Sequence, residues 1–175
     1  MNRRDCANHS PWVSAEHVFW ISPESHTSDC CDRPRNNIFL IPGTGFNIDL
    51  NNVAEGTVSI ELARLAISCA LLRRALVKID FSTIIEVEDG NEVELLIALK
   101  RTCNGYSTVL ETYELEFDAV ESLPFSFTFT DSDICCRYGC CIYTVEIVRI
   151  DVEGGTRVNE IETESTAINA IVQRY

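Results

Sequence analysis

The chain has 175 residues, of which 46% are hydrophobic and 23% are charged, and this balance argues against wholesale disorder. That length suits one globular domain, or one domain with an extension. The net charge of −13 opposes the charge of nucleic acid backbones and anionic lipid, so we expect neither a nucleic acid partner nor membrane insertion.

Residues 1–40 are predicted to form an amino-terminal connector arm ahead of a domain over residues 41–175. The arm shows no persistent helical or strand period, and it contains all three histidines and both tryptophans. It also lacks an apolar run of roughly 7–15 residues, which a secretory signal peptide would need. Three aromatic residues of the arm are candidate anchors in an apolar groove: Trp12, Phe19 and Trp20. The groove could belong to the same subunit or to a neighbouring one.

From residue 38 onward, apolar and β-branched runs alternate with Gly, Asn, Asp and Pro. In one of them Phe125, Phe127 and Phe129 alternate with polar residues, and this period of two is typical of half-buried strands. The nine runs cover residues 38–41, 46–50, 57–67, 75–87, 92–102, 107–117, 124–130, 141–151 and 165–174. Short strands at this spacing predict an all-β fold, an antiparallel jelly-roll-like β-sandwich of about eight strands.

Three segments need separate interpretation. Residues 61–76 also fit a helical period, but the β-patterned surroundings favour a strand, and Arg73 and Arg74 interrupt any membrane span. Residues 43–45 (Gly-Thr-Gly) are predicted to form a turn. The acidic residues between 86 and 94 surround a predicted hairpin tip, where a solvated charged face is expected.

Six of the nine cysteines occur as adjacent pairs, at positions 30–31, 135–136 and 140–141. Adjacent residues on an extended chain point to opposite faces, so the two sulfurs of a pair are suited to two different disulfides. The candidates for disulfides between subunits are Cys6, Cys30, Cys31, Cys135, Cys136, Cys140 and Cys141. The other two cysteines, Cys69 and Cys103, lie in predicted strands and are equally suited to the core.

Two other interpretations of these cysteines stay open. Zinc could be held by Cys135, Cys136, Cys140 and Cys141, with a histidine of the arm as a further ligand. A redox-active site would need a CxxC motif at the start of a helix, and that motif is absent.

No motif for catalysis occurs in the chain. The predicted core has no histidine, and the sequence contains neither a GxSxG nucleophile motif nor a glycine-rich phosphate loop. We therefore expect no enzyme and no cofactor. A jelly roll that binds carbohydrate or another ligand has no residue pattern to support it beyond the fold.

Four segments, in this order, resemble a family of short cysteine-rich clostridial proteins of unknown function. They cover residues 67–81, 99–105, 125–133 and 140–146, and the closing segment 158–170 is similar to the last strand of the family. In general character the chain is also similar to subunits of endospore appendages. That resemblance implies a jelly roll with an amino-terminal connector, assembled into fibres and cross-linked between subunits by disulfides.

These observations together predict a structural subunit that assembles with copies of itself into an extracellular, spore-surface or cell-surface fibre. The arm would dock on the next subunit through its aromatic anchors and through strand pairing, and Cys30 and Cys31 would form disulfides with that subunit. The alternative is a cysteine-rich zinc-binding module. A spore-surface protein made in the mother cell reaches the outside when that cell lyses, so no secretory signal peptide is expected.

Overall fold

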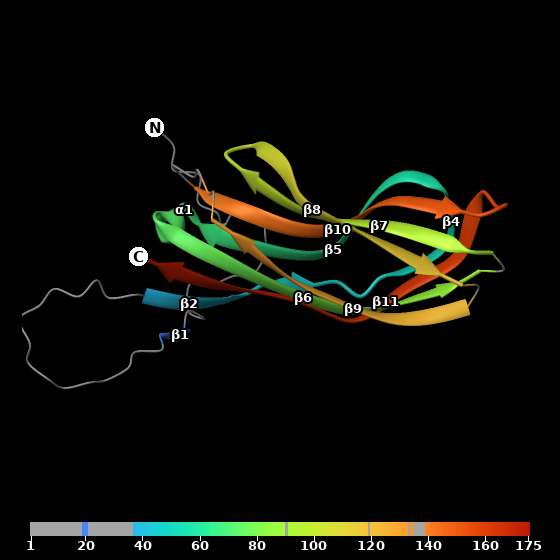
Figure 1. Ribbon diagram of the computed structural model, residues 1–175, viewed down its shortest axis with the longest axis horizontal. Helices are drawn as coiled ribbons and strands as arrows, with labels where there is room; N and C mark the ends of the chain where they lie inside the picture. The colour runs from blue at the N-terminus through green and yellow to red at the C-terminus, as the bar shows by residue number, and fades with distance from the viewer. Residues whose placement is uncertain (1–18, 21–36, 90, 119, 133, 135–138) are drawn as a thin grey trace, which may run out of the picture.

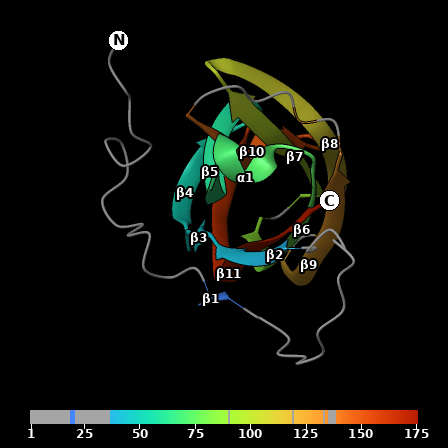
Figure 2. The same ribbon diagram turned by 90° about the vertical axis from the view of Figure 1, so that its left-hand side faces the viewer.

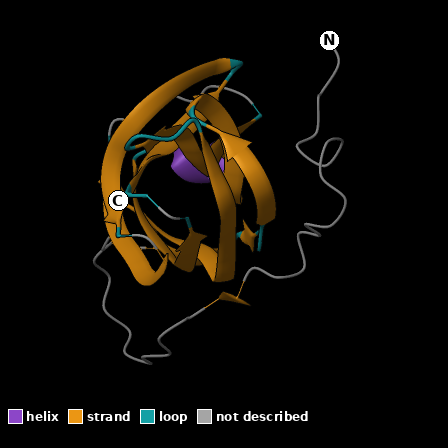
Figure 3. Ribbon diagram, turned by 90° about the vertical axis from the view of Figure 1, so that its right-hand side faces the viewer, coloured by secondary structure: helices purple, strands orange, loops and turns teal. Residues whose placement is uncertain are grey.

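The computed structural model describes residues 19–20, 37–89, 91–118, 120–132, 134 and 139–175, and nearly all of them lie in strands (Figures 1 and 3). The elements are β1 (Phe19–Trp20), β2 (Asn37–Pro42), β3 (Thr44–Gly45), β4 (Asp49–Ala54), β5 (Gly56–Ser68), α1 (Cys69–Leu72), β6 (Ala75–Glu88), β7 (Val93–Cys103), β8 (Tyr106–Phe117), β9 (Val120–Asp131), β10 (Cys140–Val152) and β11 (Arg157–Arg174). Strand β2 starts before the predicted domain boundary at residue 41.

The strands form two antiparallel sheets that face each other (Figure 2). The first sheet has the order β1-β2-β11-β6-β9, with β4 paired to the other half of β11, and the second has the order β3-β5-β10-β7-β8. If β2 and β4 count as one interrupted strand and the two-residue β1 and β3 are set aside, eight strands remain, four in each sheet. This order is that of a jelly roll, so the predicted fold class is confirmed.

The core lies between the two sheets and follows from the alternation of side chains. In β6 every second residue from Ala75 to Val87 is buried, and the residues between them face outward. The second sheet contributes Leu95, Ile97 and Leu99 from β7, all fully buried. Burial of such aliphatic side chains contributes about 1.5–3 kcal/mol each to folding.

The segment 61–76, which fitted two periods, forms a strand as far as Ser68 and then one short helix. The Ser68 hydroxyl accepts a hydrogen bond from the Ala70 backbone N–H at 3.3 Å and caps α1. The turn into β6 places Arg74 at a φ of 51°. The preference for a strand is therefore confirmed for its first half.

The predicted turn at residues 43–45 is wrong in part, because Thr44 and Gly45 form β3 and pair with β5 of the second sheet. Strands β2 and β4, on either side, belong to the first sheet, so the chain crosses between sheets here. A Cβ atom on Gly45 would lie 1.9 Å from the carbonyl oxygen of Thr166. Only glycine allows so close an approach of two backbones.

Candidate assembly surfaces

One disulfide joins neighbouring strands of the second sheet near the end that carries α1. Cys103 ends β7 and Cys141 lies at the start of β10, directly opposite in the strand register. Their Cα atoms are 4.4 Å apart, the separation typical of a pair without mutual backbone hydrogen bonds. The disulfide therefore fixes the register of these two strands.

This bond corrects one prediction. Cys141 was expected to bond to another subunit or to hold zinc, but its sulfur is bonded to Cys103 within the chain. A sulfur in a disulfide is not a thiolate and does not ligate zinc. Cys69, which the sequence left open between the core and a disulfide, begins α1 instead of lying in a strand, and it is both buried and disulfide-bonded.

The other candidate cysteines stay predictions. Cys140 begins β10 and is half-buried. The remaining candidates, Cys6, Cys30, Cys31, Cys135 and Cys136, lie outside the described residues.

Two predicted arm anchors lie on a sheet edge. Phe19 and Trp20 form β1, which pairs antiparallel with β2 so that Phe19 lies opposite Leu40 and Trp20 opposite Phe39. Leu40 is 45% exposed within this pairing, and Ile38, the residue next to the paired Phe39, is 49% exposed. The third anchor, Trp12, lies outside the described residues. The arm thus supplies a short strand to the edge of its own first sheet.

A buried ion pair connects the two sheets beside the Cys103–Cys141 disulfide. The carboxylate of Asp131, the last residue of β9, lies 2.6 Å from a guanidinium nitrogen of Arg101 on β7. It also accepts a hydrogen bond of 2.9 Å from the hydroxyl of Tyr143 on β10. Burial, followed by the charge of Asp131, raises the pKa of Tyr143 far above its usual value. This hydroxyl therefore stays protonated and acts as a structural donor.

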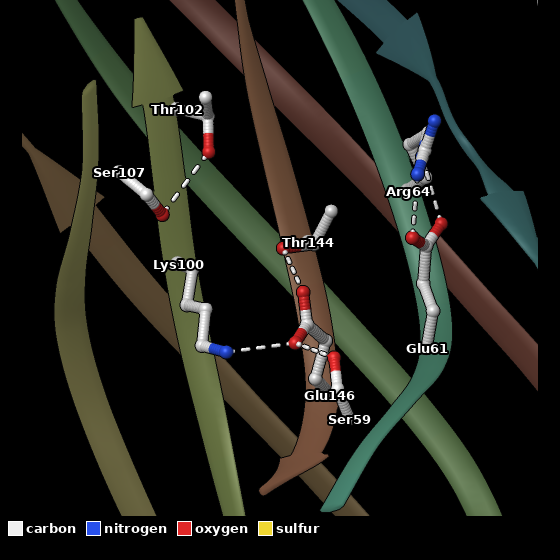
Figure 4. A network of polar contacts seen from close by, with 8 residues as sticks. All are labelled: Ser59, Glu61, Arg64, Lys100, Thr102, Ser107, Thr144 and Glu146. Carbon is white, nitrogen blue, oxygen red and sulfur yellow. Dashed lines mark hydrogen bonds and ion pairs between the residues drawn. The ribbon is translucent and has the colours of Figure 1, made fainter. Parts of the chain in front are cut away.

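The outer face of the second sheet carries a polar network that is satisfied within the chain (Figure 4). Glu146 on β10 accepts hydrogen bonds from Lys100, Thr144 and Ser59 at 2.7, 3.0 and 3.1 Å. Burial alone would raise the pKa of Glu146, but these bonds outweigh it and lower the pKa. Arg64 and Glu61 form a separate pair at 2.6 Å. These charged side chains are paired with each other, which indicates that they have a structural role on this face of the sheet.

Carboxylates gather on the first sheet at the end of the molecule away from α1. Side-chain carboxylate oxygens of Asp49, Glu160 and Glu162 all lie within 4.8 Å of one another. In the strand register Glu160 lies opposite Glu88 and Glu162 opposite Glu86, and these four glutamates line a pocket. A side-chain hydrogen bond with Glu160, together with the negative charges of Glu160 and Asp49, raises the pKa of Glu162.

The sequence indicated only part of this cluster. Glu86 and Glu88 belong to the predicted acidic hairpin, whereas Asp49, Glu160 and Glu162 come from segments more than 100 positions apart (49 against 160). Only the register of β4, β11 and β6 brings them together.

Replacing Glu162 by glutamine is expected to stabilise the protein at pH 7 and to have little effect at pH 4. The raised pKa means that the folded chain binds more protons than the unfolded chain between the usual pKa of 4.5 and the raised value. The stability of the unaltered protein therefore falls as the pH rises through that window. The Glu162→Gln variant should lose this part of the fall, and thermal unfolding followed by circular dichroism at both pH values measures it.

The control for this experiment is Glu114→Gln, an exposed position on β8 of the other sheet. It should change the unfolding temperature little at either pH. Equal effects of the two variants would contradict mutual repulsion within the carboxylate cluster.

A family model described as a domain of unknown function, DUF4489, matches residues 36–173. The chain belongs to the DUF4489 family. The match runs from just before β2 almost to the end of β11, so the DUF4489 region and the sandwich coincide. The predicted membership of a family of unknown function is thereby confirmed. No curated protein matches this DUF4489 sequence.

The DUF4489 sandwich is similar to solved viral structures. A structure of the infectious bursal disease virus Gx strain has a TM-score of 0.51 and 13% identity, and the likeness covers 87% of this chain and 38% of that one. A structure of T=1 particles derived from infectious bursal virus has a TM-score of 0.51 and 12% identity, over 95% of this chain and 36% of that one. The DUF4489 chain thus spans less than half the length of these viral chains, and the likeness shows the fold alone.

Within the described residues of this DUF4489 protein, no helix has the length and apolar character needed to cross a membrane.

Proposed function

We propose that this protein is a structural subunit that assembles with copies of itself into an extracellular, spore-surface or cell-surface fibre. The arm docks each subunit on the next, and disulfides of Cys30 and Cys31 make the junction covalent. The observation that carries the proposal is the pairing of β1, a piece of the arm, with the edge strand β2. Strand addition at a sheet edge is a general mode of protein association.

The same pairing can form between subunits. Among the described residues β1 pairs with only two residues of β2, so the rest of β2 is available as an edge, including the exposed Ile38. An arm that leaves its own β2 and pairs with the β2 of the next copy makes the same backbone contacts there. Such an exchange of identical elements is a low-cost route to assembly.

Two further observations support this role. The sandwich resembles a chain solved in virus-derived T=1 particles, which are themselves assemblies. Cys103, Cys141 and Cys69 are disulfide-bonded, and disulfides persist mainly in oxidising surroundings outside the cytosol.

The proposal predicts a ladder of covalent oligomers in thiol-blocked protein from its native source, boiled in detergent without reductant. Reductant should convert the ladder to a single monomer band. A Cys30→Ser/Cys31→Ser variant should show no ladder, because its arm has lost both adjacent thiols.

The matched control is Ser25→Ala/Ser28→Ala, which alters the same part of the arm and keeps its cysteines. It should retain the ladder. A ladder that persists in the cysteine variant would contradict cross-linking through these residues. A monomer band in every lane, together with a monomeric mass in solution, would contradict the fibre.

A further inference from the structure

The described part of the sandwich carries opposite charges at its two ends. The strands run along the longest axis of the molecule, with α1 and the carboxyl terminus at one end and the turns after β6, β8 and β10 at the other (Figure 1). The end with α1 carries exposed arginines and is called the basic end, and the end with the turns carries carboxylates and is called the acidic end. Figure 3 views the molecule from the acidic end, with α1 behind the strands.

The basic end is formed by Arg73, Arg74 and Arg174. Arg73 and Arg74 are exposed in the turn between α1 and β6, and Arg174 ends β11 opposite Ala75. The Tyr175 backbone N–H donates to the Arg74 carbonyl at 3.1 Å, which holds these segments together. The ion pairs formed among the described residues use other cations.

The acidic end is formed by two groups of carboxylates. The first group is the cluster on β4, β6 and β11: Asp49, Glu86, Glu88, Glu160 and Glu162. The second group lies on the turns and the adjacent ends of strands: Glu92, Glu116, Asp118 and Glu153. The charge of Glu153, above all, raises the pKa of Glu92, so these carboxylates repel one another.

We propose that the basic end of one copy of this protein docks on the acidic end of the next, so that subunits associate head to tail. The occupant of each end is therefore a second copy of the same chain. Arginines of a neighbour would offset the repulsion at the acidic end, and carboxylates of the other neighbour would pair with the arginines at the basic end. This inference rests on the proposed function, because it supplies the non-covalent contact along the fibre.

The charges also select the symmetry of the contact. Two acidic ends brought together by a two-fold axis would place like charges against each other, which disfavours a closed dimer. A head-to-tail contact is heterologous, and such a contact produces an open filament unless its rotation closes a ring. The charge distribution thus favours the kind of assembly that a fibre needs.

The arm is compatible with this contact. The chain enters β2 at Asn37, whose partner in the register is Arg174 of the basic end. The 16 residues between β1 and Asn37 could span at most about 55 Å. That reach is enough to cross the junction and meet the next copy.

The test uses the full chain in reductant at low salt, so that disulfides contribute nothing, with association measured by sedimentation velocity. The basic-end variant is Arg73→Glu/Arg74→Glu, and the acidic-end variant is Glu160→Lys/Glu162→Lys. Each variant alone should associate about tenfold more weakly than the unaltered chain. Salt at about 0.5 M should weaken association of the unaltered chain, because exposed charges are screened over a few ångströms.

Mixing the two variants in equal amounts provides the decisive result. The basic-end variant has acidic groups at both ends, and the acidic-end variant has gained lysines at its acidic end. Each end of one variant therefore faces opposite charges on the other variant, so the mixture should recover association as alternating copies. The control Glu111→Lys/Glu114→Lys makes the same change of charge on exposed positions of β8 and should associate as the unaltered chain does. Circular dichroism of every variant confirms that it is folded.

Folded variants that associate normally, or a mixture that fails to recover association, would overturn the head-to-tail contact. If the non-reduced ladder is still present, the fibre proposal survives that result. If the unaltered chain is monomeric in every condition and forms no ladder, both proposals fail.

Discussion

Replacing Asp131 by alanine is expected to lower the free energy of unfolding by about 3 kcal/mol. The Asp131 side chain is 5% exposed and accepts hydrogen bonds from Arg101 and Tyr143. Without this carboxylate, a largely buried guanidinium and a buried hydroxyl lose a partner that water does not fully replace. The loss should lie at the low end of the range for a broken buried ion pair, because the Arg101 side chain keeps 16% exposure.

Urea unfolding measures this effect, and Tyr143→Phe is the matched comparison. That variant removes one hydrogen bond and keeps the ion pair, so it should cost about 1 kcal/mol. An Asp131→Ala variant no less stable than Tyr143→Phe would show that the ion pair between the sheets contributes little.

Removing the Cys103–Cys141 disulfide should have an effect of similar or larger size. The two residues are 38 positions apart, and closing a loop of that length restricts the unfolded chain by about 4 kcal/mol on the chain-entropy estimate. The Cys103→Ala/Cys141→Ala variant should therefore unfold at a much lower urea concentration in the absence of reductant.

The neighbouring pair in the register, Thr102 and Ile142, provides the control. The double alanine variant at these positions loses cross-strand side-chain contacts but no covalent bond, so it should cost less than half as much. Equal losses in the two double variants would mean that the disulfide acts only through its packing.

Most strands could be predicted because one face of each is buried. The runs 75–87, 92–102 and 107–117 differ from β6, β7 and β8 by at most one residue at each end, since alternation and flanking turns define them. The run 46–50 was displaced, because the crossing between sheets at Gly45 depends on contact with Thr166, far away in the sequence.

The start of β11 was missed for a local reason. This strand begins at Arg157 instead of the predicted 165, and its pairing with β6 is irregular between Glu164 and Ala167. Ser165 has a φ of 54°, and such a residue shifts the alternation of side chains that the prediction used.

The candidate surfaces were less predictable, because they depend on strand register. Adjacency in the pair at 140–141 suggested different surroundings for the two sulfurs, and Cys141 is buried whereas Cys140 is half-buried. Its partner Cys103 could not be chosen from the sequence, since nothing local aligns β7 with β10. The carboxylate of Asp131 likewise meets Arg101 only after the two sheets pack.

The alignment of the strands with the long axis has a mechanical consequence. Tension on the chain at Asn37 acts along β2, which is paired with β11 from Asn37 opposite Arg174 to Pro42 opposite Asn169. The hydrogen bonds between these strands lie across the direction of pull, so they carry the load together instead of opening one after another. A subunit held by its arm is thus loaded in shear between β2 and β11.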